Sequence, residues 1–272
     1  MSHEMDLSFL DRPEILEVIF PVVYSPFVQD DYFTSSSSNA KVYSTEVEKD
    51  VNVDNGFWVS SKESPSILYF HGNGETVNGH EWIAPLYNQH KINLFVTDYR
   101  GYGSSNGKPT VANMLSDAHF VFRDFQEIIR KEGFNNRIFL MGRSLGSLPA
   151  IELAFHYQDD ICGLIIESGS ANNLHRLLEY FNNADMQLLL SEDSLFLNKV
   201  KIRQVQKPTL IIHGEYDQVL PLSEGQELHQ NSGAKDKQLL IIPGADHNSI
   251  MTAALDLYFD TIEDFIKSSL IY

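Results

Sequence analysis

The segment Gly142-Arg143-Ser144-Leu145-Gly146 places one serine between two glycines. It follows the apolar run 137–141 and precedes a helix-like stretch, which is typical of a strand–turn–helix. In such a turn the glycines permit close approach of the backbone, and the strained serine presents its hydroxyl at the top of a sheet. The pattern predicts that Ser144 is a nucleophile, provided that a base, an acid and an oxyanion hole accompany it.

Asp217 and His247 are the residues that could activate this serine. Asp217 ends the segment HGEYD (213–217) and His247 ends PGADH (243–247), and each segment directly follows an apolar strand. A serine hydroxyl is a weak nucleophile, so a histidine must take its proton, while a buried carboxylate fixes the imidazole tautomer and stabilises the imidazolium. The 30 residues from Asp217 to His247 suit one helix plus one strand. The order favours a Ser-His-Asp triad.

The sequence offers two alternatives for the acid. Glu167 ends the preceding strand, where a carboxylate could also reach the imidazole. Asp246 adjoins His247, but neighbouring side chains generally diverge, so a surface or turn role is expected for it. Asp217 is the preferred acid.

An acyl-transfer site must also stabilise the developing oxyanion. Two backbone N–H donors are expected, one from the residue after the nucleophile and one from the first strand–helix loop. These are Leu145 and Asn73, the latter in the segment HGNG (71–74). Glycine-rich loops can instead cradle phosphate, but neither 72–74 nor 101–107 has the G-x-G-x-x-G or P-loop pattern. His71 and His213 each precede a glycine at a strand end and are expected to be structural hydrogen-bonding residues.

The elements that would position these residues alternate between strands and helices. Short apolar strands are expected at 66–70, 92–97, 138–141, 163–166, 209–212 and 238–242, and helices at 75–90, 110–131, after Ser144 and at 249–268. This alternation predicts a mostly parallel, doubly wound α/β sheet with helices on both faces. In such sheets ligands bind at the carboxyl ends of the strands, where each motif above falls.

The N-terminal part of the chain has a different pattern. A short helix is expected over 14–20, followed by an extended segment containing Pro21 and Pro26. Residues 41–60 alternate between apolar and polar types, which predicts an antiparallel pair of strands at a sheet edge, with Asp54-Asn55-Gly56 as the turn. We expect residues 1–40 to pack on a single domain that spans 41–272.

About 40 residues separate the strand ending near Glu167 from the one beginning at Thr209. A structureless loop of this length is unusual in a compact domain. Leucines in this interval have helical spacing, which indicates a small helical cap insertion at about 170–206. The alternative is an ordinary helix packed on the sheet.

Composition limits the partners of the chain. Its 272 residues include 20 basic and 37 acidic side chains, with a formal net charge of −17. This charge repels polyanions and anionic lipid surfaces, so we expect no nucleic-acid partner. The single cysteine excludes an intrachain disulfide and a Cys-rich metal site. The N-terminus lacks a signal-peptide pattern, and no apolar stretch approaches the roughly 18 residues of a membrane span. A cytoplasmic protein is expected, of an oligomeric state that the sequence leaves open.

The serine turn, the HGN loop, DYRGYG (98–103), HGEYD and PGADH, in this order, resemble the α/β-hydrolase superfamily. More narrowly, the chain is similar to small single-domain serine hydrolases with an HGN oxyanion loop, a group of esterases, thioesterases and peptidase-like proteins. The resemblance covers about residues 40–268. It implies an eight-stranded sheet, hydrolysis through an acyl-enzyme, and no cofactor or metal.

The resemblance also implies roles for individual residues. Ser144 is the nucleophile, Asp217 the acid and His247 the base, with Asn73 and Leu145 as oxyanion donors. Asp98, Tyr99 and Arg100 of the DYRGYG segment are implied to be structural.

The sequence thus predicts a carboxylic ester hydrolase for a small-molecule substrate with a small to medium acyl group. Thioesterase, amidase or peptidase activity would use the same residues, and a non-catalytic binding protein on the same fold is a further alternative. Arg143 brings a positive charge next to the nucleophile and could bias the substrate.

Overall fold

The computed structural model describes residues 8–24, 40–172 and 197–270. Residues 173–196, the larger part of the expected cap insertion, lie outside this range. Within the described ranges, no helix is both long and apolar enough to cross a membrane.

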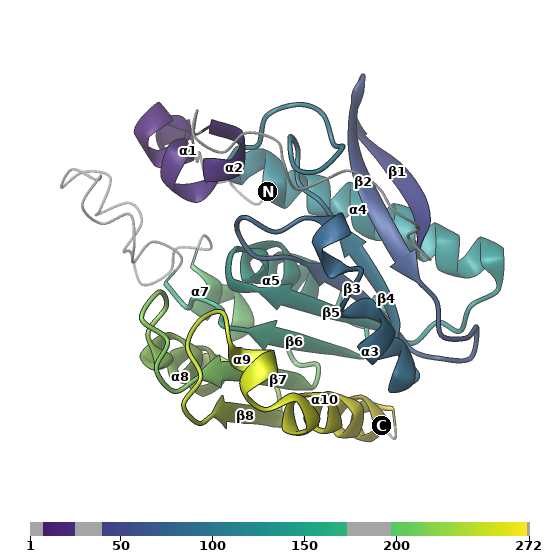
Figure 1. The fold of residues 1–272 in the computed structure, drawn as a ribbon, viewed down its shortest axis with the longest axis vertical. Helices are drawn as coiled ribbons and strands as arrows, with labels where there is room; N and C mark the ends of the chain where they lie inside the picture. The colour runs from purple at the N-terminus through teal and green to yellow at the C-terminus, as the bar shows by residue number, and fades with distance from the viewer. Residues whose placement is uncertain (1–7, 25–39, 173–196, 271–272) are drawn as a thin grey trace.

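One eight-stranded sheet organises the described chain, in the order β1-β2-β4-β3-β5-β6-β7-β8 (Figure 1). The strands are β1 Lys41–Glu48, β2 Val51–Trp58, β3 Ser66–Phe70, β4 Asn93–Thr97, β5 Ile138–Arg143, β6 Gly163–Glu167, β7 Thr209–Gly214 and β8 Lys237–Ile242. The strands from β4 to β8 in this order pair in parallel, whereas β1 and β2 pair antiparallel to each other, and β2 pairs antiparallel to β4. The predicted α/β-hydrolase sheet, with its antiparallel edge, is confirmed.

The central strands are short apolar runs because helices cover both faces of the sheet. The α-helices are α1 Pro13–Ile19, α2 Pro21–Tyr24, α3 Ala84–Gln89, α4 Val111–Glu132, α5 Ser147–His156, α7 Asn198–Ile202, α8 Leu222–Asn231, α9 Ile250–Ala253 and α10 Leu255–Ser269. Short 3-10 helices are η1 Ser8–Asp11, η2 Val77–His80, η3 Ser144–Gly146 and η4 Gln158–Asp160. One apolar core joins α1, α4, α5 and α7 to one face, and a second joins α3, α9 and α10 to the other.

The described part of the N-terminal segment packs on this domain. Leu10, Ile15, Leu16 and Phe20 are buried in the same core as α4 and α5. The expected extended segment at Pro21 is instead the start of α2. Proline is well tolerated there because its fixed φ suits the first turn of a helix, where its missing N–H is not needed.

The turn between the first two strands lies elsewhere than predicted. It falls between β1 and β2 at Lys49 and Asp50, where Asp50 has a φ of 63°. Asn55 and Gly56 lie inside β2. Asn55 is buried and donates to Thr45 and to the Val53 carbonyl, so tertiary contacts override its turn preference.

Two predicted helices are each broken into shorter pieces. The stretch 75–90 forms η2 and α3, because Pro85 is accommodated only in the first turn of a new helix. The stretch 249–268 forms α9 and α10, separated by Ala254, whose φ of −150° lies outside the helical region.

Candidate active site

Ser144 lies directly after β5, on a turn that leaves no room for side chains at its two glycines. A Cβ on Gly142 would come within 2.3 Å of the Gly146 carbonyl oxygen, and one on Gly146 within 2.0 Å of the Phe70 carbonyl oxygen. Ser144 itself has a φ of 51°, which is uncommon for a residue other than glycine. The tight packing therefore accounts for both glycines and holds the serine in the strained conformation of a nucleophile turn.

The three residues predicted as a triad lie in one hydrogen-bonded chain. His247 Nε2 is 2.9 Å from Ser144 Oγ, and His247 Nδ1 is 2.7 Å from Asp217 Oδ2. Asp217 and His247 are buried, and Ser144 is half-buried. They come from the loops after β7, β8 and β5, which converge at the carboxyl edge of the sheet. A base is thus in contact with the hydroxyl, and a carboxylate with the base.

Asp217 is held by several donors. Its Oδ1 accepts from the amides of Val219 and Leu220 at 2.9 and 2.8 Å, and its Oδ2 accepts from the Ser168 hydroxyl at 3.1 Å. Burial raises the pKa of Asp217, but the hydrogen bonds from His247 and Leu220 outweigh it and lower the pKa below its ordinary value. Asp217 is therefore an anion at neutral pH.

Two further residues support this loop. His213 is buried, and its Nε2 donates to the Leu220 carbonyl at 2.8 Å, in keeping with its expected structural role. Ser168, which sequence reasoning missed, follows β6 directly and has a φ of 44°. The feature of the sequence that could have identified Ser168 is its position directly after an apolar strand, next to Glu167.

The other two candidate acids are engaged elsewhere. Glu167 accepts hydrogen bonds from Arg143 and from the Tyr258 hydroxyl. Asp246 is exposed and accepts from Asn248 and Ser249, as a turn residue does. Neither carboxylate is placed against the imidazole as Asp217 is.

The HGN loop is braced from the DYRGYG segment. Asp98 contacts His71 Nε2 at 3.1 Å, and Tyr99 donates to the His71 carbonyl at 2.7 Å. The Tyr102 hydroxyl donates to Asn73 Oδ1 at 3.0 Å. The structural roles implied for Asp98 and Tyr99 therefore consist of fixing the loop that carries Asn73. Tyr102 was not singled out from the sequence.

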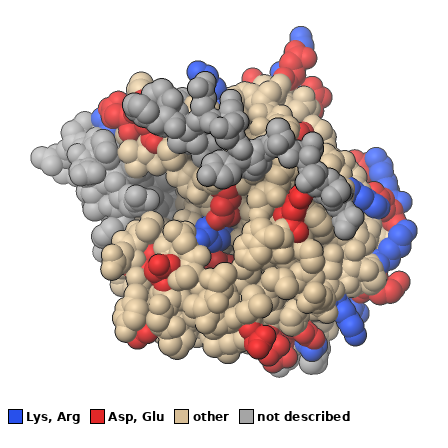
Figure 2. All heavy atoms as spheres, in the orientation of Figure 1, with Lys and Arg blue, Asp and Glu red and all other residues tan. Residues whose placement is uncertain are grey.

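A cavity of about 540 Å³ lies beside the His247 loop. Its charged lining consists of Glu75, Arg143 and Glu167, and Asn248 and Trp82 also line it. In the space-filling view, basic and acidic side chains meet in a hollow near the middle of this face (Figure 2). The cavity therefore combines apolar and charged lining residues, and Arg143 contributes to its wall.

Two groups of side chains in the described residues could hold a metal ion: His119, Glu152 and His156 in one, and His90, Asp260 and Glu263 in the other. In each group a lysine already neutralises a carboxylate, Lys201 for Glu152 and Lys267 for Glu263. Neither group contains a residue of the Ser144 chain of hydrogen bonds. These ion pairs explain the two carboxylates as structural contacts. Glu152 joins α5 to α7, and the Glu263 pair lies within α10.

The sheet order and the serine turn at its carboxyl edge define an α/β hydrolase. Residues 61–202, just over half of the chain, match the family model described as serine aminopeptidase, S33, and the chain belongs to this family.

Curated relatives are similar over most of the chain. Protein bem46 of Schizosaccharomyces pombe is 29% identical over 214 residues, which cover 77% of this chain and 70% of that protein. Human alpha/beta hydrolase domain-containing protein 17B is 27% identical, covering 76% and 67% of the two chains. The structure of the Pyrococcus furiosus esterase Pf2001 superposes with a TM-score of 0.69 at 16% identity, covering 88% and 98%. This superposition shows that the two proteins share a fold.

Proposed function

We propose that the protein is a serine hydrolase that cleaves a carboxylic ester of a small-molecule substrate through an acyl-enzyme. The observation that carries this proposal is the continuous contact from Asp217 through His247 to Ser144. Membership of a hydrolase family supports it, and so does the similarity of the fold to a protein called an esterase.

In the first half-reaction, Ser144 Oγ attacks the acyl carbonyl carbon and its proton passes to His247 Nε2. The carbonyl oxygen becomes an oxyanion, which in this proposal accepts hydrogen bonds from the backbone N–H groups of Asn73 and Leu145. The leaving alcohol oxygen then takes the proton from His247 as its bond to carbon breaks, leaving the acyl group on Ser144. Asp217 stabilises the imidazolium through Nδ1 in the interval.

In the second half-reaction, water attacks the acyl carbon while His247 Nε2 takes one of its protons. The bond between carbon and Ser144 Oγ breaks, the proton returns to Oγ, and the carboxylic acid leaves. His247 thus acts as base and then acid in each half, so one histidine serves the whole cycle.

An amide bond is the second candidate for the scissile bond. The matching family model is described as serine aminopeptidase, which favours including this class. The same three residues would serve, with an amine in place of the alcohol as leaving group.

The test is a substrate panel on the wild type and the Ser144→Ala variant. The panel contains p-nitrophenyl esters of increasing acyl length, matched acyl thioesters, and aminoacyl p-nitroanilides. We expect ester turnover that falls by a factor on the order of 10⁴ or more in the folded variant. Wild-type turnover of the anilides alone would replace the ester with the amide. Undiminished turnover in Ser144→Ala would refute the proposed nucleophile.

A further inference from the structure

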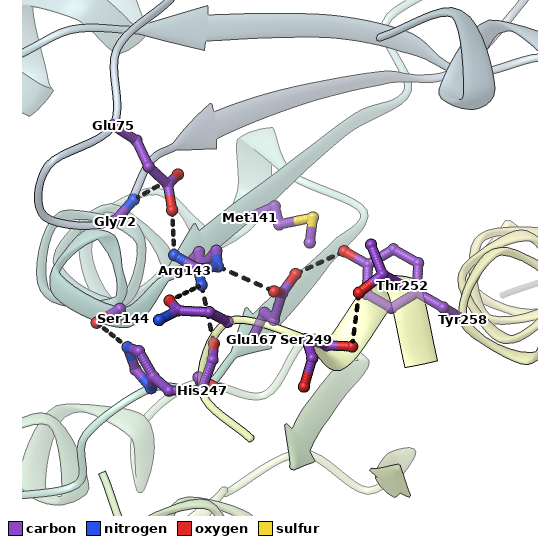
Figure 3. A network of polar contacts seen from close by, with 12 residues as sticks. Gly72, Glu75, Met141, Arg143, Ser144, Glu167, His247, Ser249, Thr252 and Tyr258 are labelled. Atoms are coloured by element: carbon purple, nitrogen blue, oxygen red, sulfur yellow. Dashed lines mark hydrogen bonds and ion pairs between the residues drawn. The ribbon is translucent and has the colours of Figure 1, made fainter. Parts of the chain in front are cut away.

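Arg143 occupies the centre of a polar network beside the triad (Figure 3). Its Nη2 donates to the backbone carbonyl of His247 at 2.8 Å and to Asn248 Oδ1 at 3.2 Å. Its Nε donates to Glu167 at 3.1 Å, and its Nη1 to Glu75. The side chain is 13% exposed. One guanidinium thus joins the end of the nucleophile strand to the loop that carries the base.

The same network reaches the HGN loop. Glu75 uses its second oxygen, Oε2, to accept from the backbone N–H of Gly72 at 3.1 Å. Gly72 directly precedes Asn73, the proposed oxyanion donor. Glu167 is likewise shared, because its Oε2 accepts from the buried Tyr258 hydroxyl at 2.6 Å. Each carboxylate therefore holds Arg143 with one oxygen and another part of the site with the other.

Stability alone does not explain such a cluster. Burying a cation between two carboxylates has a desolvation cost that the attraction often only balances, so apolar side chains would serve a core equally well. What the cluster adds is fixed geometry, since a guanidinium donates in several defined directions at once. The backbone atoms that it fixes here belong to the two loops proposed to carry the base and one oxyanion donor.

We propose that Arg143 is a positioning residue, whose guanidinium holds the His247 backbone directly and the HGN loop through Glu75, in register with Ser144. This inference rests on the proposed function. Because Arg143 directly precedes Ser144, its guanidinium ties both loops to the residue next to the proposed nucleophile, whose Oγ lies 2.9 Å from His247 Nε2. A misplacement of about 1 Å in such a site lowers the rate by roughly 100-fold.

The test is Arg143→Ala, followed by chemical rescue with guanidinium ion. The truncated side chain leaves space that is continuous with the cavity of about 540 Å³, since Arg143 lines it. We expect kcat for the best ester of the panel to fall by about 100-fold while KM changes little. Guanidinium, at concentrations far below those that unfold the protein, is expected to restore kcat saturably. A sodium salt at equal ionic strength is expected to leave kcat of the variant unchanged.

Arg100→Ala is the matched control. Arg100 is 11% exposed and also binds two carboxylates, Asp117 with its Nε at 2.7 Å and Glu48 with its Nη1 at 2.6 Å. It contacts neither the His247 loop nor Glu75 among the contacts of the described residues. We expect its kcat to stay within a few-fold of the wild type and to be indifferent to guanidinium.

Arg143→Lys keeps the charge and serves where Arg143→Ala does not fold. A single ammonium cannot reach all of these acceptors, so kcat is expected to fall with KM preserved. Unchanged kcat in either variant, a loss confined to KM, or a loss in Arg143→Ala that guanidinium does not restore would overturn the positioning role. A wild type that cleaves no substrate of the panel would instead overturn the proposed function.

Discussion

Replacing Asp217 with asparagine tests the proposed acid with the smallest change in shape. Asp217 Oδ1 accepts from two backbone amides, of Val219 and Leu220, whereas Oδ2 faces His247 Nδ1 at 2.7 Å. In Asp217→Asn the amide oxygen keeps the two backbone donors. The new NH₂ group therefore faces Nδ1 of the histidine.

This orientation reverses the tautomer of the imidazole. With a donor opposite, Nδ1 must accept, so the ring proton moves to Nε2, which can no longer take the proton of Ser144. The variant also loses the negative charge that stabilises the imidazolium. We expect kcat to fall by about 10⁴-fold, which corresponds to roughly 5.5 kcal/mol in the activation free energy.

The assay is ester hydrolysis at neutral pH, with thermal unfolding to show that the variant is folded. Asp246→Asn is the control, because Asp246 is the neighbour of His247 in sequence but is exposed and bonds only to its own turn among the described contacts. We expect its kcat to stay within a few-fold of the wild type. An active Asp217→Asn, or an equal loss in the two variants, would refute the assignment of the acid.

Two further predictions concern stability. A Cβ on Gly146 would come within 2.0 Å of the Phe70 carbonyl oxygen, so Gly146→Ala is expected to lose about 3 kcal/mol or more of unfolding free energy; an unchanged thermal midpoint would contradict this. Burial raises the pKa of Glu152, but His119 and Lys201 outweigh it and lower the pKa from 4.5 to about 2. The lowered pKa of Glu152 therefore contributes about 3 kcal/mol to the free energy of unfolding. This contribution is complete above about pH 4.5 and is lost as the pH falls toward 2. In urea unfolding, the difference in stability between wild type and Glu152→Gln should shrink as the pH falls through this window, and a difference that is constant with pH would contradict it.

The sequence was most informative where one segment forms a strand and also places a candidate site residue at the end of that strand. Ser144, Asp217 and His247 each follow an apolar run that forms a buried parallel strand, so their convergence at one sheet edge follows from topology. The turn predicted at Asp54 was wrong for a related reason. Its turn chemistry is local, but the burial of Asn55 against Thr45 is a tertiary contact that no local pattern encodes.

The contacts of Arg143 could not be predicted in this way. Its partners Glu75, Glu167 and His247 come from three separate segments, and they are brought together only by the order of the strands. The sequence places a positive charge next to Ser144, which by itself suggests a bias on the substrate. In the structure the guanidinium donates hydrogen bonds to two protein carboxylates and to a backbone carbonyl. Its role therefore concerns the geometry of the site.

The central claim is that Ser144 is a nucleophile activated by His247. The most direct measurement is labelling of the folded protein with a fluorophosphonate, followed by intact mass and peptide mapping. We predict one adduct per chain, located on Ser144, and no adduct in Ser144→Ala under the same conditions. A wild type that stays unlabelled, or an adduct on another residue, would contradict the account.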